Sequence, residues 1–164
     1  MSGGGRRIVA ADASATEGIG AALARGFEPN SRAAVKVHLQ GDLGAGKTTL
    51  ARGLLRALGV TGPVRSPSFS LLEEYATPRA RVVHADLYRL AGPADLRGLG
   101  LADHDEPGTL WLVEWPERGG AALGDADLLV SLTARPDHHV IELSPHTDVG
   151  RGWLARLDPA AAST

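Results

Sequence analysis

Apolar and polar residues alternate through residues 35–40, whose sequence is VKVHLQ. A period of two is typical of a strand with at least one buried face. Leucines then recur every four residues through residues 50–58, which places them on one face of a helix. Gly59 follows, and a glycine at that point can close a helix in the left-handed conformation. The pattern therefore predicts a strand, a glycine-rich loop and a helix, in that order.

A strand and a helix are also predicted before this unit. Residues 6–12 favour a short strand, and Ser14 with Glu17 matches the S-x-x-E capping box that opens many helices. Apolar residues at helical spacing follow, and this helix is expected to end near Gly26 and Pro29. The chain thus begins with a strand and a helix ahead of the glycine-rich loop.

Two pairs of β-leaning segments are joined by connections too short for a crossover helix. The segment TPRA separates residues 68–75 from residues 82–90, and RPDHH separates residues 128–134 from residues 140–144. Connections of this length favour hairpins. We therefore expect antiparallel pairing in both places, which departs from a plain alternation of parallel strands and helices.

The remaining segments are a central strand and two short helices. A dense apolar run at residues 109–113, TLWLV, predicts a strand buried on both faces in the middle of the sheet. A weak helix interrupted by glycines is predicted at residues 94–103, and a short closing helix at residues 153–157. Residues 159–164 are expected to form a disordered tail.

The glycine-rich loop carries the strongest chemical signal. Gly41, Gly46, Lys47 and Thr48 satisfy GxxxxGK[ST], a loop that cradles phosphate groups when it joins a strand to a helix. Free backbone N–H groups and the positive end of the helix dipole favour phosphate at that position. Lys47 is expected to reach the β- and γ-phosphates of ATP, and the Thr48 hydroxyl to hold Mg²⁺. The alternative is a glycine-rich turn with an exposed lysine.

The pattern and the motif together predict the fold class. We expect an α/β fold with the three layers of P-loop NTPases, whose mixed sheet has a parallel core and antiparallel hairpins. Residues 1–158 are predicted to form this single domain. Thr16, at the start of the first helix, either contacts the nucleotide base or simply supports the helix start. The loop residues expected to bind ATP or ADP are Asp42, Leu43, Gly44, Ala45, Gly46, Lys47, Thr48 and Thr49.

Two carboxylates at strand ends are candidates for completing a hydrolytic site. Glu114 directly follows the central apolar strand, where a carboxylate holds the Mg²⁺ shell or orients the attacking water. Asp86 lies in the second β-leaning segment, and it is either a catalytic carboxylate or a surface group paired with Arg89 or Arg81. His84 lies two residues away on the same strand face, so it either supports Asp86 or is a plain strand histidine.

Composition narrows the class of protein. The 164 residues suit one domain, and the net charge of −2 gives no strong attraction toward nucleic acid, so a link to RNA is expected to run through partners. The absence of cysteine excludes disulfides and thiolate zinc sites. No apolar stretch has the length of a signal peptide core or a membrane span, so we expect a cytoplasmic protein that makes no membrane contact.

Four motifs in this order resemble the TsaE family, also called YjeE. They are the loop GDLGAGKTT, SPSF at Ser66–Phe69, HADLYRL at His84–Leu90 and VEWPER at Val113–Arg118. The resemblance spans about Ser14–Pro145, which is nearly the whole chain. Four ordered motifs are far more specific than a P-loop alone.

The resemblance implies an ATPase that works with the proteins TsaD and TsaB. In that family, the partners install threonylcarbamoyl on the N6 of the adenosine beside the tRNA anticodon, and ATP hydrolysis is needed for cycling of the assembly. Contact with tRNA is then only indirect. The SPSF segment corresponds to a mobile, switch-like loop near the γ-phosphate.

The motif matches also imply roles for individual residues. Lys47 would be a phosphate ligand, and Thr48 with Glu114 would belong to the Mg²⁺ shell. Asp86 would be a catalytic or metal-positioning carboxylate, and Trp115 would lie near the nucleotide.

Two other classes of P-loop protein are open alternatives. A small-molecule kinase shares the loop and a similar length, but kinases of that class need an arginine-rich lid, and no segment here looks like one. A GTPase-type switch commonly reads guanine with an Asn-Lys-x-Asp motif, whereas Asn30 is the only asparagine and precedes the loop. Asp95–Gly98 spells DxxG, but it follows a Gly-Pro break rather than a strand end.

Overall fold

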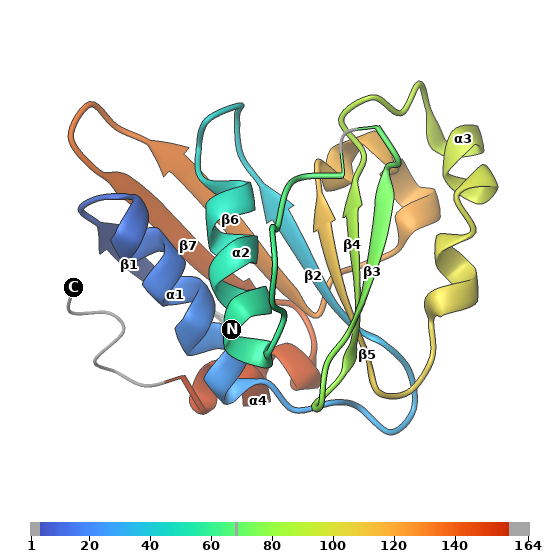
Figure 1. Ribbon diagram of the computed structural model, residues 1–164, viewed down its shortest axis with the longest axis horizontal. Coiled ribbons are helices and arrows are strands. Elements are labelled where there is room, and N and C mark those ends of the chain that lie inside the picture. The colour runs from blue at the N-terminus through green and yellow to red at the C-terminus, as the bar shows by residue number, and fades with distance from the viewer. Residues whose placement is uncertain (1–3, 68, 158–164) are drawn as a thin grey trace.

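The computed structural model describes residues 4–67 and 69–157, so the predicted tail at 159–164 lies outside it. Within these residues, seven strands form one mixed sheet in the order β1-β7-β6-β2-β5-β4-β3 (Figure 1). Strands β4, β5, β2 and β6 are parallel, and antiparallel strands flank them on both sides, as predicted. The strands are β1 (Arg6–Ala10), β2 (Val35–Gln40), β3 (Leu72–Ala76), β4 (Arg81–Asp86), β5 (Thr109–Glu114), β6 (Leu128–Ala134) and β7 (His139–Pro145).

Helices lie on both sides of the sheet. Helices α1 and α2 cover one face, and the apolar residues of α1, α2 and α4 share one core with that face (Figure 1). A smaller core on the opposite face joins β4 and β5 to α3 and the nearby 3₁₀ turns. No helix in the described part of the chain is long and apolar enough to span a bilayer. The helices are α1 (Ala13–Gly26), α2 (Lys47–Leu58), α3 (Pro93–Gly98) and α4 (Asp148–Ala155), and the 3₁₀ turns are Leu101–His104, Pro116–Arg118 and Gly120–Leu123.

The start of α1 differs from the predicted capping box. The N-cap is Asp12, whose carboxylate accepts a hydrogen bond from the backbone N–H of Ala15 at 2.8 Å. Ser14 is an exposed residue of the first turn, so the proposed pairing of Ser14 with Glu17 is wrong. Aspartate caps a helix as well as serine does, so Asp12 is as good a start for this helix as Ser14.

Two predicted segments are shorter than expected, for local reasons. Strand β4 ends at Asp86, because its carboxylate accepts a hydrogen bond from the Tyr88 backbone N–H at 3.0 Å and turns the chain. The helix predicted at 94–103 divides into α3 and a 3₁₀ turn, and Gly100 between them has φ 71°. Such a conformation interrupts a right-handed helix.

Glycines allow α1 and α2 to cross at very short range. A Cβ atom added to Gly20 of α1 would lie 2.1 Å from the Leu50 carbonyl oxygen, and one added to Gly53 of α2 would lie 2.0 Å from the Glu17 carbonyl oxygen. The two backbones therefore touch at these positions. This contact sets the position of α2, whose N-terminus carries the P-loop lysine.

Gly20→Ala is expected to lower the free energy of unfolding by about 2–3 kcal/mol, because a methyl group at Gly20 forces the two helices apart. Gly18→Ala is the matched control on the same helix, since in the described structure a Cβ there meets no atom within 4 Å apart from its chain neighbours and its own helix backbone. That substitution should stabilise the protein by about 0.5–1 kcal/mol. Urea denaturation of both variants measures the difference, and equal stabilities would contradict the packing described.

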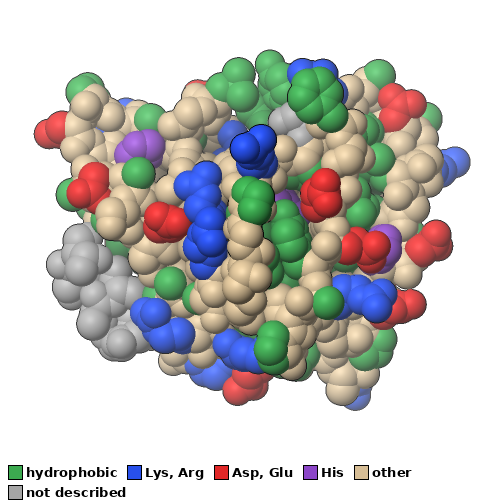
Figure 2. Space-filling model, in the orientation of Figure 1, with side chains coloured by type: hydrophobic (Ala, Val, Ile, Leu, Met, Phe, Trp, Pro, Cys, Tyr) green, Lys and Arg blue, Asp and Glu red, His purple; other side chains and the backbone are tan. Residues whose placement is uncertain are grey.

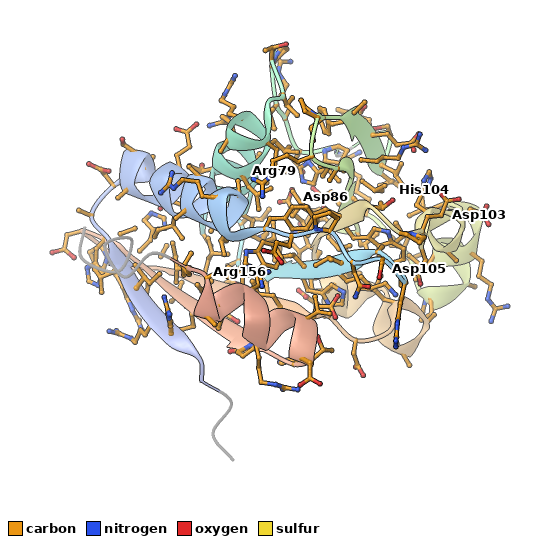
Figure 3. The ribbon with its side chains drawn as sticks, turned by 90° about the horizontal axis from the view of Figure 1, so that it is seen from below. Arg79, Asp86, Asp103, His104, Asp105 and Arg156 are labelled. Carbon is orange, nitrogen blue, oxygen red and sulfur yellow. The ribbon has the colours of Figure 1, made fainter. Side chains whose placement is uncertain are left out.

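Two arginines hold the C-terminal end of α1. Arg79 donates hydrogen bonds to the carbonyl oxygens of Ala24 and Phe27, and Arg156 donates to that of Gly26 at 2.9 Å. Both arginines lie beside α1 in Figure 3. Positive charge at this end of the helix is also stabilised by the negative end of the helix dipole. The β3–β4 hairpin and the chain after α4 are thereby tied to α1.

Candidate functional site

The P-loop connects β2 to α2 at the carboxyl edge of the parallel strands. Gly41 is needed there because a Cβ atom would lie 2.5 Å from the Leu132 carbonyl oxygen. Gly46, with φ 105° and ψ 13°, is the N-cap of α2 and provides no side-chain cap. The first backbone N–H groups of α2 are therefore left for a ligand, which is the arrangement that binds phosphate.

The Lys47 side chain lies across this loop. Its ammonium donates hydrogen bonds to the carbonyl oxygens of Gly41 and of Asp42, the latter at 3.0 Å, and lies 4.3 Å from the centre of the Trp115 ring. Burial lowers the pKa of Lys47 below its ordinary value, although the charges of Glu114 and Asp86 act in the opposite direction. Among the described residues Lys47 forms no ion pair, so its charge is not neutralised by a carboxylate in direct contact.

Glu114 is the last residue of β5 and is only 2% exposed. One carboxylate oxygen accepts a hydrogen bond from the Thr48 hydroxyl at 3.2 Å, and the other lies 2.7 Å from His84 Nε2. The complete burial of β5 and its interior position between β2 and β4 confirm the strand predicted from the apolar run. Parallel strands end at a common edge, which is why Glu114 faces the start of α2.

Asp86 ends β4 directly beside Glu114, since the two residues are partners in the β4–β5 register. It is 6% exposed, and its carboxylate accepts hydrogen bonds from the Ser66 hydroxyl and the Tyr88 backbone N–H. Figure 3 shows it near the centre of the molecule. Asp86 is therefore not a surface group paired with an arginine.

The proposed support of Asp86 by His84 is not what the structure shows. His84 is fully buried, and its ring contacts Glu114 on the neighbouring strand instead. Arg89 also lies elsewhere, with its guanidinium 4.8 Å from the centre of the Phe69 ring. A pattern along one strand shows which side chains share a face, but not which of them meet a side chain of the next strand.

These groups surround a cavity of about 280 Å³. Nine of the predicted site residues line it, and Ser66 and Tyr88 are additions. Asp42 and Ala45 line a neighbouring cavity on the other side of the loop, together with Leu43 and Trp115. The predicted residues that line the first cavity are Leu43, Gly44, Gly46, Lys47, Thr48, Thr49, Asp86, Glu114 and Trp115.

Thr16 and His139 support the loop from behind. Thr16 is buried, its hydroxyl donates to the Asp12 carbonyl oxygen at 3.3 Å, and its methyl group lies 3.5 Å from the position of a Cβ at Gly46. It does not line the cavity. His139, at the start of β7, donates from Nδ1 to the Ala45 carbonyl oxygen at 2.8 Å. Sequence reasoning missed this contact, because no local pattern links residues 94 positions apart.

Trp115 has an unusual backbone conformation, with φ 57° and ψ 52°. Left-handed geometry at a bulky residue costs about 1–3 kcal/mol and persists only where the surroundings enforce it. Here it turns the indole ring onto Lys47 and places it 4.9 Å from the Tyr88 ring. The ring therefore packs against the Lys47 ammonium.

Trp115 should report nucleotide binding through its fluorescence, because its ring contacts the lysine that would bind the phosphates. Addition of a non-hydrolysable ATP analogue is expected to change the emission of the wild type, and Trp115→Phe should remove that change. Trp153→Phe, in α4, is the matched control and should keep it. A full response from the Trp115→Phe protein would show that another tryptophan is the reporter.

Large apolar side chains are exposed at the same edge of the sheet. Leu43 of the P-loop is 69% exposed, Phe69 is 88% exposed and Tyr88 is 39% exposed. Figure 2 shows hydrophobic side chains gathered along the top of this face. Exposed apolar groups that cluster beside a cavity are typical of a surface that another molecule covers.

The sheet, covered on both faces, carries a glycine-rich loop at a helix N-terminus, a buried lysine in that loop and two adjacent carboxylates. These features define a P-loop nucleotide-binding protein. The model of the family "Threonylcarbamoyl adenosine biosynthesis protein TsaE" matches residues 10–141, which is most of the chain. The chain therefore belongs to the TsaE family, and the resemblance seen in its motifs is confirmed.

Relatives and a solved structure agree with this assignment. The tRNA threonylcarbamoyladenosine biosynthesis protein TsaE of Haemophilus influenzae is 43% identical over 122 residues, which cover 74% of this chain and 77% of that protein. The protein of the same name from a Nostoc species is 39% identical over 117 residues, or 68% of each chain. The crystal structure of Bacillus subtilis YdiB superposes with a TM-score of 0.76 at 26% identity and covers 93% of both chains.

Proposed function

We propose that this chain binds ATP with Mg²⁺ and hydrolyses it, as an accessory subunit of the machinery that makes N6-threonylcarbamoyladenosine in tRNA. The observation that carries the proposal is the convergence of Lys47, Thr48, Glu114 and Asp86 on one cavity at the start of α2. Membership of the TsaE family supplies the biosynthetic context.

The residues of the loop account for nucleotide binding. The β- and γ-phosphates would lie against the N–H groups at the start of α2, and the Lys47 ammonium would leave its two carbonyl partners to contact them. This exchange is favourable because a phosphate oxygen carries more negative charge than a carbonyl oxygen. Gly44 and Gly46 leave the loop open to close approach.

The oxygen donors of Thr48 and Glu114 suit Mg²⁺ bound together with a nucleotide better than a metal ion held by protein ligands alone. In the described part of the chain, no three His, Asp or Glu side chains are grouped to hold a metal ion. Mg²⁺ in nucleotide sites usually takes one or two protein ligands, with phosphate oxygens and waters completing its shell. Thr48 and Glu114, 3.2 Å apart, would provide the protein side of that shell. The metal, when bound, neutralises charge that develops on the phosphates.

The contacts of Asp86 support a different role from that of Glu114. Its carboxylate faces the same cavity, but it is held by the Ser66 hydroxyl and the Tyr88 backbone rather than by Thr48. In this position it would orient the attacking water or a water of the metal shell. Ser66 belongs to the SPSF segment, so movement of that segment would alter the hydrogen bonding of Asp86.

We further propose that TsaB and TsaD are the partners, that contact with tRNA runs through them, and that the protein acts in the cytoplasm. The apolar groups exposed beside the cavity support docking of a partner at this edge. The net charge of −2 supports the absence of direct tRNA binding.

Phosphate release from ATP tests the proposal. The purified chain, a mixture of TsaB and TsaD, and all three together are compared at equal concentrations with Mg²⁺. Low turnover by the chain alone and a marked rise in the full mixture are expected. Turnover that does not change on mixing would contradict the accessory role, and phosphate transfer to small metabolites rather than to water would indicate a kinase.

A further inference from the structure

His84 is a buried histidine that the proposed chemistry does not use directly. It lies in β4, is 0% exposed, and brings Nε2 to 2.7 Å from a carboxylate oxygen of Glu114. Its other ring nitrogen, Nδ1, is buried and has no hydrogen-bond partner among the described residues. Leu112, its partner in the β4–β5 register, is apolar.

The hydrogen bonding assigns the proton to one ring nitrogen. A proton on Nδ1 would be a buried donor without an acceptor, and Nε2 would then present its lone pair to a carboxylate oxygen. A proton on Nε2 avoids both penalties, because it is donated to Glu114. Nε2–H is therefore the group that donates to the Glu114 carboxylate.

The hydrogen bond from His84 fixes the orientation of the Glu114 carboxylate. His84 holds one carboxylate oxygen, so the other is directed at the Thr48 hydroxyl. An apolar side chain at position 84 would fill the buried space without leaving a ring nitrogen unsatisfied. The hydrogen bond to Glu114 therefore explains the polar ring at this position better than packing does.

We propose that His84 is a positioning residue, which sets the Mg²⁺ response of the site by fixing the carboxylate of Glu114. The inference rests on the proposed function, because it assumes that Glu114 contributes to a metal shell. Groups that orient a metal-binding side chain commonly change metal affinity or activity by 10- to 100-fold when they are removed.

The test compares glutamine and asparagine at position 84. Glutamine can place an N–H donor near the position of Nε2, whereas the shorter asparagine reaches only as far as Nδ1. Calorimetry measures the affinity for a non-hydrolysable ATP analogue in Mg²⁺ and in EDTA, and the ratio of the two is the gain due to the metal. This readout does not depend on turnover.

His84→Asn is expected to reduce the gain due to Mg²⁺ by about tenfold or more, with little change of affinity in EDTA. His84→Gln should keep the gain within about threefold of the wild type. His38→Gln is the matched control, since His38 is a buried strand histidine of β2 with an unpartnered Nε2 and no contact with Glu114 among its described hydrogen bonds. Melting temperatures establish that each variant is folded, and His84→Met replaces the asparagine variant if that protein does not fold.

The outcomes separate this inference from the proposed function. The role of His84 would be overturned if His84→Asn kept the wild-type gain in affinity due to Mg²⁺. Equal losses of that gain in His84→Asn and His84→Gln would also overturn it. A wild-type protein that binds the analogue equally well with and without Mg²⁺ would also overturn it, while leaving nucleotide binding intact. A wild-type protein that binds no nucleotide would refute the proposed function, and the inference with it.

Discussion

The Lys47→Ala variant is expected to bind ATP and ADP about 100-fold more weakly than the wild type, or below the limit of detection. A hydrogen bond between charged groups contributes about 1.5–3 kcal/mol, and this lysine would contact two phosphates in a buried site. Among the described residues its ammonium has only neutral partners, so its charge would be available to the ligand. Calorimetric titration with ADP measures the loss.

Two further variants make this result specific. Lys47→Met keeps the length of the side chain without its charge and should lose as much affinity as the alanine variant. Arg56→Ala removes an exposed cation from the last turn of the same helix and should bind normally. If the arginine variant were weakened as much as the lysine variants, net charge rather than the loop contact would explain the binding.

Replacement of Glu114 by glutamine is expected to lower ATP turnover by about 100- to 1000-fold while nucleotide is still bound. Glutamine has nearly the same shape, and its side-chain oxygen can still accept the hydrogen bond from His84, so the fold should survive. In the proposed mechanism, the negative charge that this variant loses would help to hold the Mg²⁺ shell or orient the attacking water. Single-turnover phosphate release, measured beside binding of an ATP analogue, distinguishes the two steps.

Asp86→Asn should give the same separation of binding from hydrolysis, since Asp86 faces the same cavity. Glu106→Gln is a suitable control, because Glu106 is an exposed residue of the loop before β5. Unchanged phosphate release in both the Glu114 and the Asp86 variants would remove the roles assigned to them.

The parts of the site that could be predicted are those that depend on residues close together in the sequence. Residues 35–58 contain the strand, the loop and the helix in succession, so spacing alone predicted that Lys47 would lie at a helix start. Glu114 could be found because an uninterrupted apolar strand leads directly to it. The first helix was predicted with its correct end, because Gly26 interrupts the apolar spacing.

The parts that could not be predicted depend on contacts between distant segments. His84 meets Glu114 only because β4 and β5 are neighbours in the sheet. His139 at the start of β7 meets Ala45 in the loop after β2, although β6 lies between these two strands. The capping residue of α1 was missed because two adequate caps lie within three positions. The backbone of Trp115 is set by its packing against Lys47 and Tyr88, which residue type alone does not indicate.

The pairing of Asp86 with Glu114 has a consequence for how faithfully this chain assembles. Strands β4 and β5 are almost entirely buried on both faces, so burial alone barely distinguishes the native alignment from one displaced by a single residue. A displaced strand would keep most of its apolar contacts but turn its terminal carboxylate away from the loop. We therefore expect the hydrogen bonds of Glu114 and Asp86 at the strand ends to favour the native alignment. A correctly formed site would then be a stricter measure of correct assembly than the yield of soluble protein.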